Sequence, residues 1–188
     1  MISKLINKII KYNGSMEYRP LSDADINDNY QHDFVVEHYK DYIEGKKVLD
    51  AGCWTGPLEK VIVKKNIATK LLGVDINQDA LSVARRNFPD FDFQYCALRG
   101  SNKKDDSFVK NYSSFFDTVI FLDVIEHLPK NTEHDVIRLF HRLLKNNGTL
   151  IVSTMASHPL NLIDPAWLLG HRHYRLKYLR KIFQYAWF

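Results

Sequence analysis

A chain of 188 residues with 45% hydrophobic and 26% charged residues is long enough for one domain with a substantial core, and its composition is that of a globular protein. Its two cysteines, Cys53 and Cys96, match neither a disulfide framework nor a zinc site, so a cytoplasmic protein is expected. The sequence shows no apolar run long enough to span a bilayer and no signal peptide with a cleavage site.

The formal net charge is +4, but the basic residues gather near the C-terminal end of the sequence. No acidic residue follows Asp164. The basic residues in the last part are Arg172, Arg175, Lys177, Arg180 and Lys181. A solvated helix face is the ordinary explanation of such a run, and a surface for an acidic substrate, RNA or anionic lipid is the alternative.

The N-terminal part of the chain predicts two helices. Residues 2–10 have apolar side chains at the spacing of an amphipathic helix, which we expect to cover its own domain, with weak contact to a membrane surface as the alternative. Residues from about 29–44 predict a second helix that ends at Gly45. We therefore expect a helical cap over residues 1–45 and a second domain over residues 46–188.

Strands and helices alternate through the second domain. The expected strands cover residues 47–51, 70–76, 91–96, 117–124 and 149–155. The expected helices cover residues 57–65 (with Pro57 in the first turn), 77–88 (capped by Asn77), 132–148 (stopped by Gly148) and 174–186. The stretches 99–107 and 155–172 are expected to be loops. This alternation predicts an α/β fold with a doubly wound parallel sheet.

The segment "VLDAGCWTG", residues 48–56, combines a buried strand with a glycine turn. Gly52 permits a tight turn and close approach of the backbone to a ligand, and Gly56 lets the next helix present its N-terminus. Trp54 stands where such loops commonly have a further glycine. We expect its backbone to face the ligand without needing a positive φ, while the indole turns outward as a roof over the pocket.

Carboxylates follow the first two strands of this domain. Asp50 ends the first strand and can face a cationic or amino group. Asp75 ends the second strand, where a carboxylate can accept two hydrogen bonds from a ribose diol. A third segment, "FLDVIEHLP" at residues 121–129, closes the fourth strand. The carboxyl ends of these strands are therefore the expected ligand site.

Four segments in order, "VLDAGCWTG", "GVDINQDAL", "FDTVIFLDVIEHLP" and "LLKNNGTLIVST", resemble the motifs of class I S-adenosylmethionine (SAM)-dependent methyltransferases, in particular the group that includes ubiquinone-biosynthesis-type O-methyltransferases. The resemblance covers about residues 46–183. It implies SAM as the cofactor and a Rossmann-like, mainly parallel sheet with strand order 3-2-1-4-5. Relatives usually continue into two further strands, so strands 6 and 7 are expected to be missing here. This leaves a bare edge on the strand at 149–154, so we expect either a truncated chain or a protein that pairs this edge with a second chain, for which a homodimer is the candidate.

The resemblance also assigns cofactor roles. Asp50 and the Gly52 backbone are expected to hold the amino acid end of SAM, Asp75 its ribose, and Ile76 one side of its adenine. Cys96 lies where many relatives have an acid that contacts the adenine amino group, so we expect adenine recognition by backbone groups. The full expected cofactor set is Asp50, Ala51, Gly52, Cys53, Trp54, Gly56, Asp75, Ile76, Cys96, Ala97, Leu122 and Asp123, the last two beside the methionine part.

The expected reaction is O-methylation of a small-molecule substrate. The methyl group of SAM is already activated, so the protein mainly supplies orientation and, in some reactions, a base. No Asn-Pro-Pro-Tyr-like motif follows the fourth strand, which speaks against methylation of DNA amino groups. His127 is the first candidate for a catalytic base, with His173 and His158 in the segment that usually covers the substrate. A structural hydrogen bond is the ordinary alternative for His127.

Two alternatives differ in chemistry. Asp123, Glu126 and His127 have the acid-x-x-Glu-His spacing of small-RNA 3′-end 2′-O-methyltransferases, which bind a divalent metal with a further histidine. His171 or His173 would supply that ligand here, and the basic C-terminal segment would hold RNA. Because "EHLP" also occurs in metal-free relatives, no metal is our main expectation. The other alternative is a SAM-binding homologue without catalysis, which the irregular glycine loop motivates.

Overall fold

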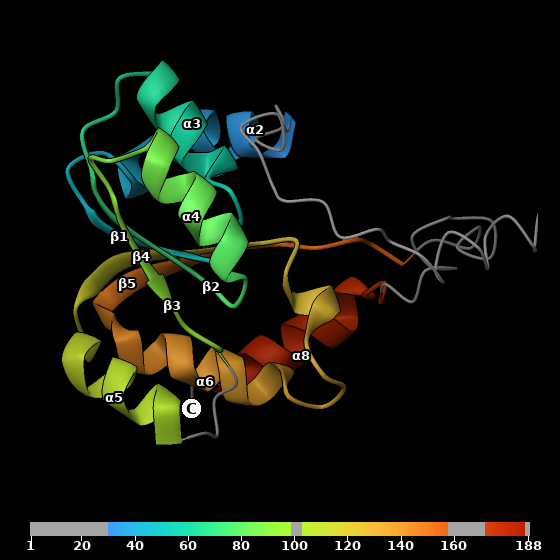
Figure 1. The fold of residues 1–188 in the computed structure, drawn as a ribbon. Coiled ribbons are helices and arrows are strands. Elements are labelled where there is room, and N and C mark those ends of the chain that lie inside the picture. The colour runs from blue at the N-terminus through green and yellow to red at the C-terminus, as the bar shows by residue number, and fades with distance from the viewer. Residues whose placement is uncertain (1–29, 99–102, 158–171, 187–188) are drawn as a thin grey trace, which may run out of the picture.

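The computed structural model describes residues 30–98, 103–157 and 172–186 and is built around a five-stranded parallel sheet (Figure 1). The strand order is β3-β2-β1-β4-β5. The strands are β1 (Lys47–Ala51), β2 (Lys70–Asp75), β3 (Asp92–Tyr95), β4 (Phe116–Leu122) and β5 (Leu144–Ser153). The predicted α/β fold and its order 3-2-1-4-5 are confirmed.

Helices cover both faces of the sheet (Figure 1). One face carries α2 (Tyr30–His38), α3 (Pro57–Lys64) and α4 (Gln78–Asn87), and the other carries α5 (Lys103–Tyr112), α6 (Glu133–Leu143) and α8 (Leu176–Ala186). Two short 3₁₀ turns, η2 (Lys40–Tyr42) and η3 (Ile125–His127), complete the described elements. The predicted helix at residues 2–10 and the candidates His158 and His171 lie outside the described residues.

Successive strand residues supply the two halves of the core. Val48 of β1 and Ile120 of β4 belong to a buried cluster with side chains of α2 and α3. Leu49 and Phe121, the next residue of each strand, belong to the cluster on the face of α5, α6 and α8. All four side chains are fully buried. Because both faces are covered, these strands are hydrophobic throughout instead of alternating with polar residues.

Local signals place the helices that follow β1 and β2. Pro57 occupies the first turn of α3, as predicted. Asn77 caps α4, and its side-chain oxygen accepts hydrogen bonds from the N–H groups of Asp79 and Ala80 at 3.0 and 3.1 Å. These two helices therefore begin directly after the loops that end β1 and β2, which puts both loops at the same edge of the sheet.

The polar stretch 99–107 differs from its prediction as a loop, because α5 begins within it at Lys103. Phe108 and Val109 are the buried residues of this helix for which burial is described. Such a short apolar face leaves little periodic signal in the sequence. Packing against α6 and the aromatic contact of Phe108 with Tyr112, at 4.7 Å between ring centroids, support the helix instead.

Two predicted helices are shorter than expected. The helix expected over residues 132–148 ends at Leu143, and Leu144 already pairs with Phe116 of β4, so Gly148 lies within β5 and is not the stop. The helix expected over residues 29–44 is interrupted after His38. At Leu144, pairing with the buried strand β4 overrides the helix propensity of the segment.

The edge of the sheet beyond β4 is formed by β5. In the described residues β5 pairs with β4 alone, and one further parallel bridge joins Ala156 to Tyr174. None of the helices in the described ranges is both long and apolar enough to cross a membrane.

Candidate functional site

A cavity of about 680 Å³ lies at the carboxyl ends of β1, β2 and β4. This is the edge where doubly wound sheets bind ligands, and the volume is within the range of small-molecule sites. The predicted cofactor residues that line the cavity are Gly52, Trp54, Asp75, Ile76, Cys96, Ala97, Leu122 and Asp123. The remaining ones, Asp50, Ala51, Cys53 and Gly56, are buried and do not line it.

The glycine loop after β1 forms one wall of the cavity and has three residues with positive φ in its turn. Gly52 has a φ of 92°, and a Cβ added there would lie 2.4 Å from Val124 Cγ2. Gly56, with a φ of 93°, is the N-cap of α3. Trp54 also adopts a positive φ, of 50°, so the expectation that this position needs none is wrong. Its indole is 41% exposed at the cavity.

Asp75 ties the glycine loop to the end of β2. Its Oδ2 accepts a hydrogen bond from the backbone N–H of Trp54 at 3.0 Å, and its Oδ1 accepts one from the N–H of Asn77 at 2.8 Å. A carboxylate oxygen has two acceptor sites, so each oxygen can still accept a hydroxyl proton. The side chain lines the cavity. This arrangement fits the diol of the expected cofactor.

A second carboxylate, Glu59, lies next to Asp50 beneath the glycine loop. Glu59 is fully buried in the first turn of α3, and neither of its carboxylate oxygens has a hydrogen-bond partner. Burial, followed by the nearby charge of Asp75, raises the pKa of Asp50 to about 8. Burial and then Asp50 likewise raise the pKa of Glu59 well above its ordinary value.

This buried acidic pair fits a cationic ligand. Burial disfavours the ionised form of both carboxyl groups, and a positive charge placed close to them stabilises that form. The amino group and sulfonium of SAM carry such charge, although Asp50 and Glu59 themselves do not line the cavity. Asp75, which does line it, offers acceptors for the ribose, so the residues present fit the cofactor. No sequence motif pointed to Glu59, because an acidic residue in a first helical turn is ordinary and is usually exposed.

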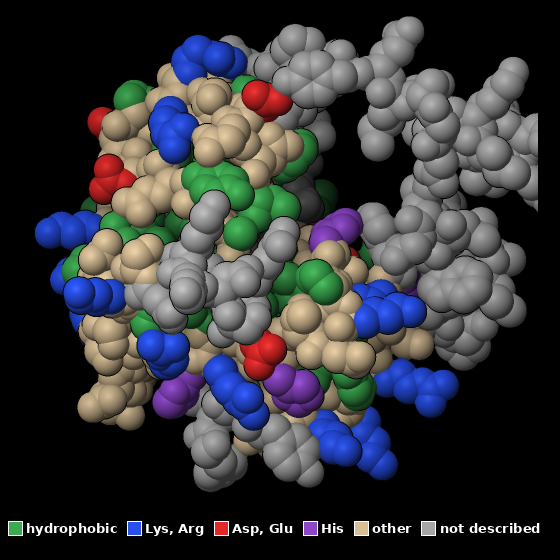
Figure 2. All heavy atoms as spheres, turned by 60° about the horizontal axis from the view of Figure 1, so that its bottom comes forward, with side chains coloured by type: hydrophobic (Ala, Val, Ile, Leu, Met, Phe, Trp, Pro, Cys, Tyr) green, Lys and Arg blue, Asp and Glu red, His purple; other side chains and the backbone are tan. Residues whose placement is uncertain are grey.

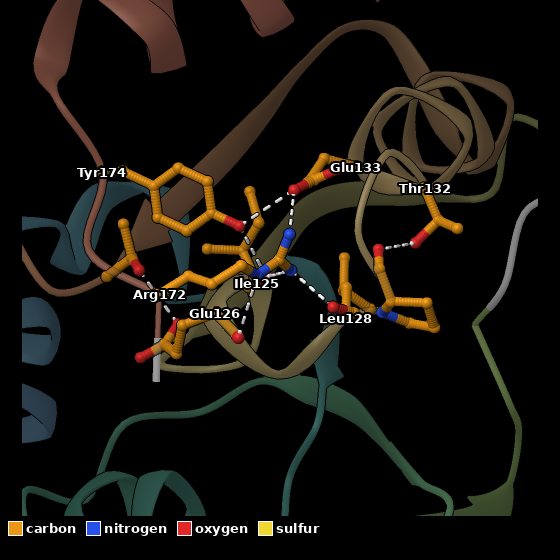
Figure 3. A network of polar contacts seen from close by, with 9 residues as sticks. Ile125, Glu126, Leu128, Thr132, Glu133, Arg172 and Tyr174 are labelled. Atoms are coloured by element: carbon orange, nitrogen blue, oxygen red, sulfur yellow. Dashed lines mark hydrogen bonds and ion pairs between the residues drawn. The ribbon is translucent and has the colours of Figure 1, made fainter. Parts of the chain in front are cut away.

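Arg172 binds the backbone of the loop after β4 through hydrogen bonds (Figure 3). Its guanidinium donates hydrogen bonds to the carbonyl oxygens of Ile125 at 2.8 Å, Leu128 at 2.5 Å and Glu126 at 3.3 Å, and pairs with the carboxylate of Glu133. The Arg172 and Glu133 side chains are 20% and 3% exposed. The guanidinium therefore faces inward, and the expectation that Arg172 belongs to a basic surface is wrong.

Tyr174 completes the same network. Its hydroxyl lies 3.0 Å from the carbonyl oxygen of Ile125 and 3.1 Å from Glu133 Oε1 (Figure 3). Burial, with the charge of Glu133 next, raises the pKa of Tyr174, so the hydroxyl keeps its proton. The segment at residues 172–174 and the loop after β4 are thus joined into one packed unit.

The basic residues of α8 behave differently from Arg172. Lys177, Arg180 and Lys181 are exposed and line a shallow depression on the helix with Leu176 and Gln184. Lysine and arginine side chains stand out on this side of the molecule in Figure 2. The ordinary interpretation, a solvated helix face, accounts for this arrangement.

The candidate histidines lie in different places. His127 ends η3, is exposed and lines the cavity. His173 is half-buried and does not line it. His32 of α2 does line the cavity, although the sequence offered no motif that pointed to it. Its position there depends on how α2 packs against the sheet, which no local pattern encodes.

The acid-x-x-Glu-His motif is not arranged as a metal centre in the described part of the chain. There, no group of three or more His, Cys, Asp or Glu side chains is placed to hold a metal ion. Glu126 is buried, and its Oε2 accepts a hydrogen bond from Thr154 Oγ1 at 2.9 Å. Its carboxylate therefore serves the packing of the loop.

Solved structures share this architecture at low sequence identity. A SAM-dependent methyltransferase from Archaeoglobus fulgidus superposes with a TM-score of 0.65 at 20% identity, covering 82% of this chain and 66% of that one. The [4+2]-cyclase SpnF superposes with a TM-score of 0.64 at 18% identity, covering 98% of this chain and 67% of that one. These likenesses establish the fold, which proteins of different reactions share.

Sequence comparisons identify the family. Residues 49–150, more than half of the chain, match the family described as a methyltransferase domain. The ubiquinone biosynthesis O-methyltransferase of Idiomarina loihiensis is 29% identical over 139 residues, which are 72% of this chain and 51% of that protein. The chain thus spans about half the length of the curated relatives it matches. With the fold, the ordered motifs and the cavity, this match shows that the chain belongs to the class I SAM-dependent methyltransferase family.

Proposed function

We propose that this protein transfers a methyl group from SAM to a hydroxyl oxygen of a small, largely apolar acceptor. The observation that carries the proposal is a single cavity lined by both Asp75 and His127. The curated relatives are named O-methyltransferases, which supports oxygen as the atom that is methylated. When bound, SAM supplies a methyl group already activated as part of a sulfonium.

The cofactor part of the proposal assigns each group by its chemistry. Asp75 accepts the ribose hydroxyls, and Ile76, which is 61% exposed at the cavity, lies against the adenine. Backbone groups of Cys96 and Ala97 recognise the adenine edge. We assign the Gly52 backbone and the buried Asp50 to the amino acid end of the cofactor.

The acceptor part of the cavity is lined by Val124, Leu128 and Pro129 together with His127. Apolar side chains exclude water and favour an aromatic or aliphatic acceptor, while the imidazole of His127 orients its hydroxyl. His173 does not line the cavity, so His127 is the stronger of the two predicted catalytic candidates.

A metal-dependent reaction on RNA has less support. Arg172 is engaged inside the protein, and Glu126 is hydrogen-bonded to Thr154. A SAM-binding role without methyl transfer stays a second candidate, because a [4+2]-cyclase has the same fold. The two candidates agree on SAM binding and differ in turnover.

Two measurements test the proposal. Calorimetric titration with SAM is expected to show saturable binding to a single site. Incubation with methyl-labelled SAM and a panel of catechols, phenols and aliphatic alcohols is expected to give a labelled ether. His127→Ala is expected to lower turnover more than SAM affinity, because its imidazole acts on the acceptor and not on the cofactor. Absence of SAM binding would contradict the proposal, and binding without transfer to any acceptor would favour the non-methylating candidate.

A further inference from the structure

The side chain of Gln31 in α2 reaches the carboxyl ends of β4 and β5. Gln31 Nε2 donates a hydrogen bond to Asp123 Oδ1 at 3.2 Å and contacts the hydroxyl of Ser153. Val35 and Val36, one turn further along α2, are buried in the cluster that includes side chains of α3. Polar and apolar contacts together therefore fix the orientation of α2 relative to the cavity.

His32, the residue after Gln31, is presented to the cavity by this docking. Its Nδ1 is buried and has no hydrogen-bond partner. A buried polar atom left without a partner carries a desolvation cost. Because His32 lines the cavity, its imidazole is a group to which the hydroxyl of a ligand bound there can donate a hydrogen bond.

The charge environment of His32 suits a proton acceptor. Burial lowers the pKa of His32, and this effect outweighs the opposing charges of Asp123, at the end of β4, and Asp33 on α2. The ring is therefore neutral at neutral pH and has a nitrogen lone pair available. Once the ring is protonated, the same two carboxylates stabilise the imidazolium.

We propose that His32 is a further catalytic residue, which accepts the proton of the acceptor hydroxyl during methyl transfer; this inference rests on the proposed O-methylation. The acceptor oxygen forms its new bond to the methyl carbon, and the bond from that carbon to sulfur breaks, with the electron pair going to sulfur. The hydroxyl proton moves to His32. The positive charge lost at sulfur reappears on the imidazolium near Asp123, so the charge enclosed by the cavity stays constant.

His127 and His32 have different roles in this proposal. His127 is exposed, and it orients the acceptor from the solvent side. His32 is a half-buried residue of α2 and receives the proton. The acceptor is thus contacted by two segments that lie far apart in the chain, one before β1 and one after β4.

The test compares His32→Gln with His38→Gln, a matched change on the exposed end of the same helix, where His38 stacks on Phe34 at 3.9 Å between ring centroids. The acceptor probe is catechol. His32→Gln is expected to lower its methylation rate by about 10²–10⁴-fold and to remove the acid limb of the pH profile, with SAM affinity retained. His38→Gln is expected to behave as the wild-type protein. Retention of both the rate and the acid limb in His32→Gln would overturn the inference.

A second readout does not depend on turnover. In ¹⁵N NMR titrations of the wild-type protein, the pKa of His32 is expected to lie below the ordinary value of a histidine side chain, and its ring signals are expected to shift when catechol is added to the complex with S-adenosylhomocysteine. A His32 with an ordinary pKa that does not respond to catechol would overturn the inference. If SAM does not bind at all, the proposed function fails, and the titration of His32 still decides whether its ring is held neutral. Equal melting temperatures of the two variants exclude misfolding as the cause of a lost rate.

Discussion

The backbone N–H of Trp54 donates a hydrogen bond to Asp75 Oδ2 at 3.0 Å. This contact joins the glycine loop after β1 to the carboxylate that ends β2. It requires only the backbone of Trp54, so a bulky residue is compatible with the loop as long as its indole points away. The positive φ of 50° at Trp54 is the conformational cost of that arrangement.

Replacing Asp75 by Asn is expected to weaken SAM binding by about 1.5–3 kcal/mol, or roughly tenfold or more, because two charge-assisted hydrogen bonds to the ribose are weakened. Calorimetric titration measures the change. Asp90→Asn, a change at an exposed site after α4, is the matched control and should leave the affinity unaltered. Equal affinities for SAM in both variants would remove Asp75 from the cofactor site.

Stability is expected to fall as the pH rises from about 4 to about 8 through the contribution of Asp50. The pKa of Asp50 is about 8 in the folded protein, whereas the unfolded chain releases this proton near the ordinary value. Between the two values the folded state holds more protons, so each rise in pH favours unfolding.

The Asp50→Asn variant tests this dependence. Because it removes the titrating group, its free energy of unfolding should decrease less than that of the wild-type protein between mildly acidic and mildly alkaline pH. Urea titrations at a series of pH values provide the comparison, with Asp90→Asn as a control of equal charge change. An unaltered pH dependence in Asp50→Asn would mean that Asp50 titrates normally.

Two substitutions in the glycine loop are expected to differ in their effect on stability. Gly52→Ala should destabilise the protein by about 1–3 kcal/mol, because the added Cβ would lie 2.4 Å from Val124 Cγ2. Trp54→Gly should change stability by less than about 1 kcal/mol, since relief of the positive φ offsets the greater freedom of glycine in the unfolded chain. Chemical denaturation of both variants measures this order, and the reverse order would contradict the loop geometry.

Arg172→Ala is expected to cost about 3–5 kcal/mol of stability, because it leaves the Glu133 carboxylate buried without its charge partner. It also removes donors from the carbonyl groups of Ile125 and Leu128. Arg175→Ala, at an exposed position three residues later, should change stability by no more than about 0.5 kcal/mol. If denaturant titration gave similar small losses for both, Arg172 would have to be a surface residue.

Much of the proposed cofactor half of the site could be predicted from the sequence, because its signals are local. A glycine turn after a hydrophobic strand, a carboxylate at the end of the next strand and the Asn77 cap each depend on a few neighbouring residues. The order of these motifs then fixed the family and the strand order. Local signals failed where a short apolar face was involved, as in α5, whose packing against α6 supports it.

The sequence by itself determined which strand ends line the cavity, since chain direction and hydrophobic runs place Gly52, Asp75 and Asp123 at one edge of a parallel sheet. Only the tertiary structure decided which side chains meet there from distant parts of the chain. Gln31 reaches Asp123, and Arg172 reaches Glu133, across long separations in sequence. Such contacts depend on how helices dock on the sheet, and docking is set by the summed packing of the core and not by any short pattern of residues.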